Sequence, residues 1–213
     1  MSYYINIYRK FMKNLKEYII EGIFDVEDNI DNIDESIKEQ IKKFLKDNFD
    51  GASSCKISDK PNNNGKYEVS STGHIIVKNY KITSFTNGLF IWTTVDKDFR
   101  CTYCDSLTSL EGAPKEVGGD FICDFCESLT SLKGAPKEVG GGFNCSRCKS
   151  LKSLKGTPKK VGGDFACNYC YSLKSLEGAP KEVNGGFYCI HCYKKFFEED
   201  VKKVSNVKGN IIV

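Results

Sequence analysis

The sequence predicts a β-rich repeat solenoid with an N-terminal helical segment and small α/β caps. The first observation is the motif Phe-x-Cys-x-x-Cys, which recurs five times at a constant spacing of 22 residues, beginning at Phe99, Phe121, Phe143, Phe165 and Phe187. The second is the pattern S-L-x-S-L-x-G-x-P-x-x-V, which follows the first four copies. So short a unit cannot bury its few apolar residues alone, whereas stacked copies cover one another.

Composition excludes several classes of protein. The chain has 213 residues, 31 Lys and Arg and 28 Asp and Glu, and this near balance disfavours a general nucleic-acid binder. No run approaches the ~20 apolar residues of a membrane helix, and the N-terminus lacks the apolar stretch of a signal peptide. We therefore expect no membrane association and a cytoplasmic rather than secreted protein. Its 11 cysteines are an odd number, which favours reduced thiols over a disulfide framework.

The repeat resembles a short-unit leucine-rich repeat. Its pattern V-x-x-x-F-x-C-x-x-C-x-x-L-x-x-L-x-x-x-P aligns with L-x-x-L-x-L-x-x-N/C-x-L over residues 99–192. The resemblance implies a short strand on which Phe121 and Cys123 point inward, then a turn carrying Leu129 and Leu132. The proline and the Gly-Gly pair close the rung, and no helix is expected because the unit is short and Gly-Gly opposes one. The P-K-E-V-G-G repeats also resemble those of bacteriophage and giant-virus proteins.

Four regions are predicted along the chain. Residues 1–50 carry two helical apolar stripes, at 3–21 and 30–45, with Gly22 and Gly51 as stops. Residues 51–98 form a β-rich cap, with strands at 66–70 and 75–78 and a degenerate first rung at 82–85. Residues 99–192 are the Cys-containing repeats. Residues 193–213 form a C-terminal cap with a helix at 198–204 and a strand at 208–213.

The five Cys-x-x-Cys units admit three interpretations: buried structural thiols, a zinc site or a redox site. A redox site needs a helix N-terminus and partial exposure, which a solenoid strand lacks. From Cys101 to Cys126 the spacing C-x2-C-x18-C-x2-C fits a zinc ribbon. However, five units is an odd number for four-ligand sites, and the repeat period already explains the spacing. We therefore expect two ladders of buried thiols, no cofactor, and less than one zinc per purified chain. A zinc-binding module that contacts nucleic acid is the alternative, and metal analysis distinguishes the two.

Catalytic patterns are not evident in the sequence. His74 and His191 are the only histidines, and neither lies beside a candidate nucleophile and acid. The sequence has no phosphate-binding loop and no paired-carboxylate pattern. We therefore expect a protein that is not an enzyme.

Comparison of the rungs identifies candidate binding residues. Framework positions barely change, whereas positions predicted to face outward on the strand vary and are rich in aromatic residues and arginine, as binding hot spots are. The predicted binding residues are Arg100, Tyr103, Phe125, Arg147, Tyr169, Tyr171, Tyr188 and His191. They indicate a protein partner, while the alternative is an ordinary surface with neutral drift between copies.

The N-terminal segment supplies a further resemblance. Residues 12–22, M-K-N-L-K-E-Y-I-I-E-G, resemble the capsid-targeting peptides of tailed bacteriophages. The resemblance implies cleavage between Glu21 and Gly22 and packaging in the phage head. A capping helix that ends at Gly22 is the alternative. Together these observations predict a non-catalytic, phage-encoded interaction scaffold in the host cytoplasm or the virion.

Overall fold

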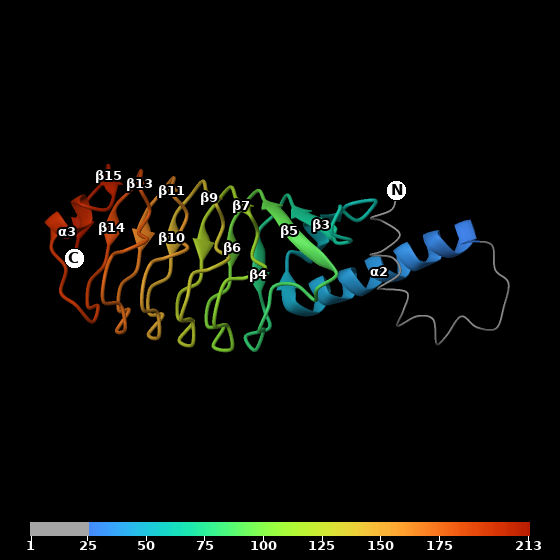
Figure 1. Cartoon of the computed structure of the whole chain (residues 1–213), viewed down its shortest axis with the longest axis horizontal. Helices are drawn as coiled ribbons and strands as arrows, with labels where there is room; N and C mark the ends of the chain where they lie inside the picture. Colours follow the sequence, from blue (N-terminus) through green and yellow to red (C-terminus); the bar gives the residue numbers. More distant parts are fainter. Residues whose placement is uncertain (1–25) are drawn as a thin grey trace.

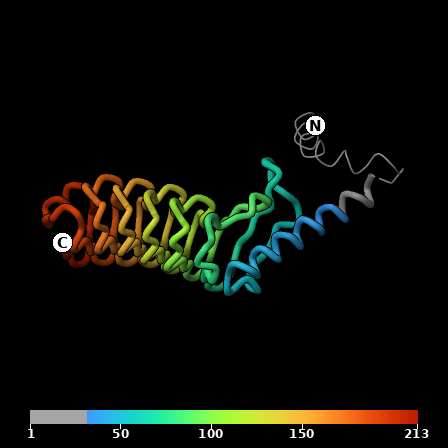
Figure 2. Tube along the Cα trace, turned by 90° about the horizontal axis from the view of Figure 1, so that it is seen from below, coloured from blue at the N-terminus to red at the C-terminus, as the bar shows by residue number. Residues whose placement is uncertain are grey.

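The chain winds into a β-solenoid whose successive turns stack along one axis (Figure 1). The computed structural model describes residues 26–213. Each turn contributes one short strand to each of two sheets, so the repeat builds two parallel faces around a shared core. Figure 2 shows the same coils from below, with the α2 end at one extreme and the C-terminus at the other.

The first sheet, sheet A, has eight strands in the order β1-β4-β6-β8-β10-β12-β14-β16. Neighbours pair in parallel, except that β1 runs antiparallel to β4. The strands are β1 (Phe49–Asp50), β4 (Ile75–Val77), β6 (Phe99–Arg100), β8 (Phe121–Ile122), β10 (Phe143–Asn144), β12 (Phe165–Ala166), β14 (Phe187–Tyr188) and β16 (Ile211–Ile212).

The second sheet, sheet B, also has eight strands, in the order β15-β13-β11-β9-β7-β5-β3-β2. Here β2 and β3 are antiparallel and the other pairs are parallel. The strands are β2 (Cys55–Ile57), β3 (Tyr67–Ser71), β5 (Phe90–Val95), β7 (Glu116–Val117), β9 (Glu138–Val139), β11 (Lys160–Val161), β13 (Glu182–Val183) and β15 (Asn206–Val207).

The predicted inward residues of the repeat form the core. Phe121 pairs in register with Phe99 and Phe143, and its ring centre lies 5.5 and 5.3 Å from theirs in stacked geometry. These rings are fully buried, as are Leu129 and Leu132. The prediction of a stacked 22-residue solenoid, with Phe, Cys and Leu inside, is confirmed.

Sheet B adds a strand that the leucine-rich alignment did not include. In each full repeat the residue before the valine and the valine itself form it, as Glu116 and Val117 do in β7. The valine is buried and the residue before it is exposed. A strand of two residues is too short for alternation to be recognised in sequence, so its formation depends on pairing with the rungs on either side.

The N-terminal end of the solenoid is closed by a helix. Helix α2 (Val26–Asn48) buries Ile41 and Leu45, which belong to the predicted stripe at 30–45. The Phe44 ring packs edge-on against Phe90 at 5.9 Å. The helix ends at Asn48, earlier than the predicted stop, and a 3-10 turn, η1 (Ala52–Ser54), follows β1. The other predicted helix, at 3–21, lies outside the described residues.

Residues 75–95 form one rung of the stack. Strands β4 and β5 pair in parallel with β6 and β7 of the first repeat, and Ile82 and Phe85 between them are buried. The predicted strands at 66–70 and 75–78 correspond to β3 and β4, which lie in different sheets. At the other end, α3 (Glu198–Lys202) buries Val201, and β15 and β16 add a last turn. No helix within residues 26–213 is long and apolar enough to cross a bilayer.

Candidate functional site

Each repeat turns a corner just after its sheet A strand, and the corner residue adopts a left-handed backbone. Its φ lies between 54° and 60° in five successive rungs. Residues other than glycine rarely adopt this conformation, and aromatic residues gain no local hydrogen bond from it. These five residues, called the corner ladder, are Tyr103, Phe125, Arg147, Tyr169 and His191.

The side chains of the corner ladder stack on one another without a break. Tyr103 and Phe125 have ring centres 4.5 Å apart and nearly parallel planes. The Arg147 guanidinium carbon lies 4.7 Å from the centre of the Phe125 ring and 4.9 Å from that of Tyr169. His191 stacks on Tyr169 at 4.9 Å. The result is a column in which arginine is held between two aromatic faces, the geometry of cation–π attraction.

Backbone hydrogen bonds set the spacing of this column. The N–H of Phe125 donates to the carbonyl of Ser146 at 3.0 Å, and the N–H of Arg147 donates to that of Asn168 at 2.7 Å. Successive corners are therefore about 4.8 Å apart, close to the distance at which flat groups stack. The sequence placed these residues on the strand itself. That placement was wrong, because the strand is only two residues long and the ladder occupies the turn beyond it.

The corner ladder is partly open to solvent. Tyr103 is 54% exposed, Arg147 and His191 are also exposed, and Phe125 and Tyr169 are half-buried. The Arg147 guanidinium forms no hydrogen bond or ion pair with other described residues, so the N–H groups along its edge are free to meet a ligand.

Three predicted binding residues lie beside the ladder or away from it. Tyr171 is 51% exposed and meets the Tyr169 ring edge-on at 6.4 Å. Arg100 and Tyr188 instead lie on the strand face of sheet A, where Arg100 pairs with Asp98 at 2.8 Å. Burial alone would raise the pKa of Asp98, but hydrogen bonds from the Asp120 N–H and from Arg100 lower it below its usual value. The predicted processing site, Glu21 and Gly22, lies outside the described residues.

The residue before Phe125 of the corner ladder, Asp124, carries a half-buried carboxylate. One oxygen of this carboxylate is buried and has no hydrogen-bond partner in the described part of the chain. Burial raises the pKa of Asp124 above its usual value, and the positive charges of Arg147 and Arg100 oppose this rise. Asp124 therefore carries a partly buried negative charge near the Arg147 guanidinium. Comparison of the rungs in the sequence did not identify it.

The cysteines of the repeats form the two predicted columns inside the core. The first column contains Cys101, Cys123, Cys145, Cys167 and Cys189, and the second contains Cys104, Cys126, Cys148, Cys170 and Cys192. All are free thiols, and all except the half-buried Cys192 are buried. The expected ladder of buried cysteines is confirmed.

A repeated hydrogen bond explains why the second column needs a thiol. The S–H of Cys126 donates to the carbonyl of Cys101 at 3.0 Å, and Cys148 donates likewise to Cys123 at 3.2 Å. Only a protonated thiol can make this bond, and an alkyl side chain of similar size would leave a buried carbonyl unpaired. Burial, followed by the neighbouring Cys126, raises the pKa of Cys101 well above its usual value. The bonded thiol of Cys148, together with burial, does the same for Cys123.

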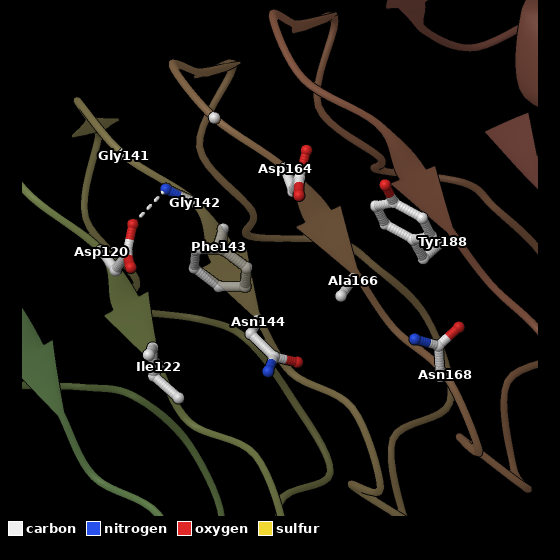
Figure 3. A pocket seen from close by; sticks show the side chains of 11 residues that line it. Asp120, Ile122, Gly141, Gly142, Phe143, Asn144, Asp164, Ala166, Asn168 and Tyr188 are labelled. Atoms are coloured by element: carbon white, nitrogen blue, oxygen red, sulfur yellow. Dashed lines mark hydrogen bonds between the residues drawn. The ribbon is translucent and has the colours of Figure 1, made fainter. Parts of the chain in front are cut away.

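Comparison of the rungs in the sequence also did not predict a depression on the outer face of sheet A (Figure 3). Its floor includes Gly142 and its walls include Asp120, Asn144 and Tyr188. The one signal in the sequence is the residue before each repeat phenylalanine, which alternates between aspartate and glycine from Asp120 to Gly186.

In the described part of the chain, no group of three or more His, Cys, Asp or Glu side chains is arranged to hold a metal ion. Comparison with known proteins finds no match to a protein family, to a curated protein or to a solved structure.

Proposed function

We propose that the protein is a non-catalytic protein-interaction scaffold and that the corner ladder is its binding surface. The observation that supports this most is the strained corner, which carries a large side chain in five consecutive rungs. Glycine would adopt the same backbone freely, whereas a side chain there costs about 1–2 kcal/mol per residue. Stacking recovers part of this cost, and a partner that engages the exposed column supplies a reason for retaining it.

The composition of the ladder indicates the chemistry of the partner. Tyrosine and arginine are the residues most often found at the energetic centre of protein interfaces. The Arg147 guanidinium is held flat between Phe125 and Tyr169, so its N–H edge presents a fixed fork. Such a fork matches a carboxylate in bidentate geometry. The partner therefore presents an acidic side chain flanked by apolar groups that cover the neighbouring rings.

A rigid column also lowers the entropic cost of binding. Each ladder side chain is already ordered by stacking on the next rung, and the solenoid backbone below it is fixed by hydrogen bonds between rungs. Less rotamer freedom is then lost when a partner docks, which favours affinity for a given contact area.

The test begins with capture of a partner from cells in which the protein is made, followed by binding of the purified partner. Arg147→Ala and Tyr169→Ala should each weaken binding by at least about 1 kcal/mol, roughly fivefold, without unfolding the protein. Arg147→Lys keeps the charge but not the fork, and we expect it to weaken binding similarly.

The matched control is Lys137→Ala, an exposed residue on the approach to β9 in sheet B. It should bind as the unmodified protein does. If Lys137→Ala abolishes binding while both ladder variants bind normally, the working surface is on the opposite side of the solenoid.

A phage origin, with a role in the host cytoplasm or the virion head, remains part of the proposal. Its support is the resemblance of residues 12–22 to capsid-targeting peptides. Intact-mass measurement of the protein recovered from purified virions tests it. We expect a chain that begins at Gly22, and a virion protein that retains residues 1–21 would contradict cleavage.

A further inference from the structure

The outer face of sheet A carries an open depression of about 520 Å³, within the ~300–1,000 Å³ range of small-ligand sites. It extends across strands β8 to β14, three rung steps or about 14 Å. Its floor is made by residues with little or no side chain, namely Gly141, Gly142, Gly163 and Ala166. The depression exists because the rung of Gly142 lacks the aspartate that its neighbours carry.

Two carboxylates flank the floor, and each is anchored by one oxygen. Asp120 Oδ1 accepts a hydrogen bond from the Gly142 N–H at 2.7 Å, the dashed line of Figure 3. Asp164 Oδ1 accepts one from the Gly186 N–H, also at 2.7 Å. No other described residue donates a hydrogen bond to the second oxygen of either carboxylate, so it remains an acceptor for a ligand.

Two amides are anchored in the same way. Asn144 Oδ1 accepts from the Ser146 N–H at 2.9 Å, and Asn168 Oδ1 accepts from the Ile190 N–H at 3.0 Å. Because the oxygen must face the N–H, each amide nitrogen turns away from that bond and keeps its two donors. The face thus presents acceptors and donors whose directions are set before any ligand arrives.

An aromatic residue closes one end of the depression. Tyr188 lies next to Ala166 in register, and Figure 3 shows its ring and hydroxyl beside the open floor. The ring is half-buried, and its hydroxyl makes no hydrogen bond within residues 26–213. The far end is bounded by Ile122. The site therefore combines an aromatic surface with separate donors and acceptors.

This combination disfavours several ligands. Asp120 and Asp164 are two rungs apart, about 10 Å, which is too far for one metal ion to bridge. Two carboxylates repel phosphates and other anions. The backbone groups of these strands are already paired with neighbouring rungs, so an extended peptide cannot add as a strand.

We propose that the depression binds a short, uncharged carbohydrate chain. Each sugar hydroxyl both donates and accepts, so it can bridge a carboxylate oxygen and an amide N–H in adjacent rungs. The apolar face of a sugar ring covers the Tyr188 ring. The floor without side chains allows the ring to approach the backbone closely, and the length across β8 to β14 accommodates an oligosaccharide rather than a single sugar. This site is separate from the corner ladder and does not depend on its role.

The test follows amide resonances of the full chain by NMR during titration with cellotetraose, chitotetraose and maltotetraose, and with tetragalacturonate as the anionic comparison. We expect at least one neutral tetrasaccharide to give saturable shifts at Gly142, Asn144, Ala166 and Asn168, and tetragalacturonate to give none. Saturable shifts with tetragalacturonate, or none with any neutral probe at about 10 mM, would overturn the proposal.

Substitutions sharpen the test. Gly142→Asp restores the residue found in the neighbouring rungs, so the fold should be kept while the floor is filled. It should lower affinity about tenfold or more, as should Tyr188→Ala. Tyr103→Ala, in the corner ladder, and Lys137→Ala, on the opposite face, are controls that should bind the sugar normally. If Gly142→Asp melts like the unmodified protein and binds the same sugar equally well, the depression is not the site.

Discussion

Each repeat turns two corners with a left-handed backbone, and the two have opposite compositions. The corner that follows the second leucine, called the closed corner, is glycine in every full repeat: Gly112, Gly134, Gly156 and Gly178, with φ between 86° and 102°. The corner ladder has φ between 54° and 60° and contains no glycine. The closed corner thus uses glycine, the residue that adopts a left-handed backbone most easily, whereas the corner ladder uses residues that disfavour it.

The lack of space between adjacent rungs explains why the closed corner is always glycine. A Cβ placed on Gly134 would lie 2.5 Å from backbone atoms of Glu111, and one on Gly178 would lie 2.5 Å from backbone atoms of Lys155. No side chain fits between those rungs, whatever its backbone preference. The corner ladder projects outward instead, so its residues are limited by strain and by what they contact. Glycine in this repeat therefore lies where adjacent rungs touch, whereas the bulky residues of the corner ladder lie where their side chains have room.

The largest effect should come from the leucines that lead into the closed corner. Leu132→Ala and Leu154→Ala each remove a fully buried side chain and should lower the free energy of unfolding by about 2–5 kcal/mol. Urea unfolding followed by circular dichroism measures this. The exposed Lys137→Ala should cost less than about 0.5 kcal/mol. Equal, small effects at both kinds of position would show that the assignment of residues to the core is wrong.

A somewhat smaller loss is expected from the closed corner itself. Gly134→Ala introduces both a left-handed alanine and a clash with the preceding rung, and should destabilise the protein by about 2–3 kcal/mol. The neighbouring Lys133→Ala removes only an exposed ion pair with Glu111 and should change stability by less than about 0.5 kcal/mol. A Gly134→Ala variant as stable as Lys133→Ala would refute the explanation by space.

Removal of the Asp124 charge beside the corner ladder should increase stability in a way that depends on pH. Because the pKa of Asp124 is raised in the fold, chiefly by burial, the folded state binds its proton more tightly than the unfolded state does. Stability therefore falls as pH rises through the carboxyl range. Asp124→Asn should stabilise the protein by about 1 kcal/mol at pH ~7, and the gain should disappear below about pH 3.9.

Unfolding of the Asp124→Asn variant at both pH values measures this gain. Glu138→Gln, which alters an exposed carboxylate on β9, is the control and should have little effect at either pH. A stabilisation of equal size at low and neutral pH would mean that charge is not its cause.

The smallest effect is expected at the corner ladder. Tyr103→Gly relieves about 1–2 kcal/mol of backbone strain and loses one stacking contact worth about 0.5–1.5 kcal/mol. The net change in stability should stay within about 1 kcal/mol. A loss above about 2 kcal/mol would show that Tyr103 is retained for stability, and would weaken the case for a binding role of the ladder.

Most residues of the candidate site could be predicted from the sequence, because the copies of a repeat can be compared with one another within one chain. Positions that stay constant, such as Phe121 and Leu132, are buried, whereas positions that vary are half-buried, as Phe125 is, or exposed, as Arg147 is. A residue that is the same in every copy indicates a position in the core, since each rung must pack against rungs of the same shape. Comparison of the copies did not separate Tyr188 from the ladder, because a period assigns residues to columns but not to faces.

The sequence by itself determined the stacked architecture, the repeat length of 22 residues and the identity of the core. Apolar residues at equal spacing can be buried only if successive copies stack on one another. Only the tertiary structure decided the rest. The sheet B strands are two residues long and exist through pairing with adjacent rungs. The corner handedness, the thiol-to-carbonyl bonds and the depression at Gly142 likewise arise between rungs. The sequence of the repeat unit specifies the residues of each rung. The contacts between rungs form only when successive copies stack in the folded protein.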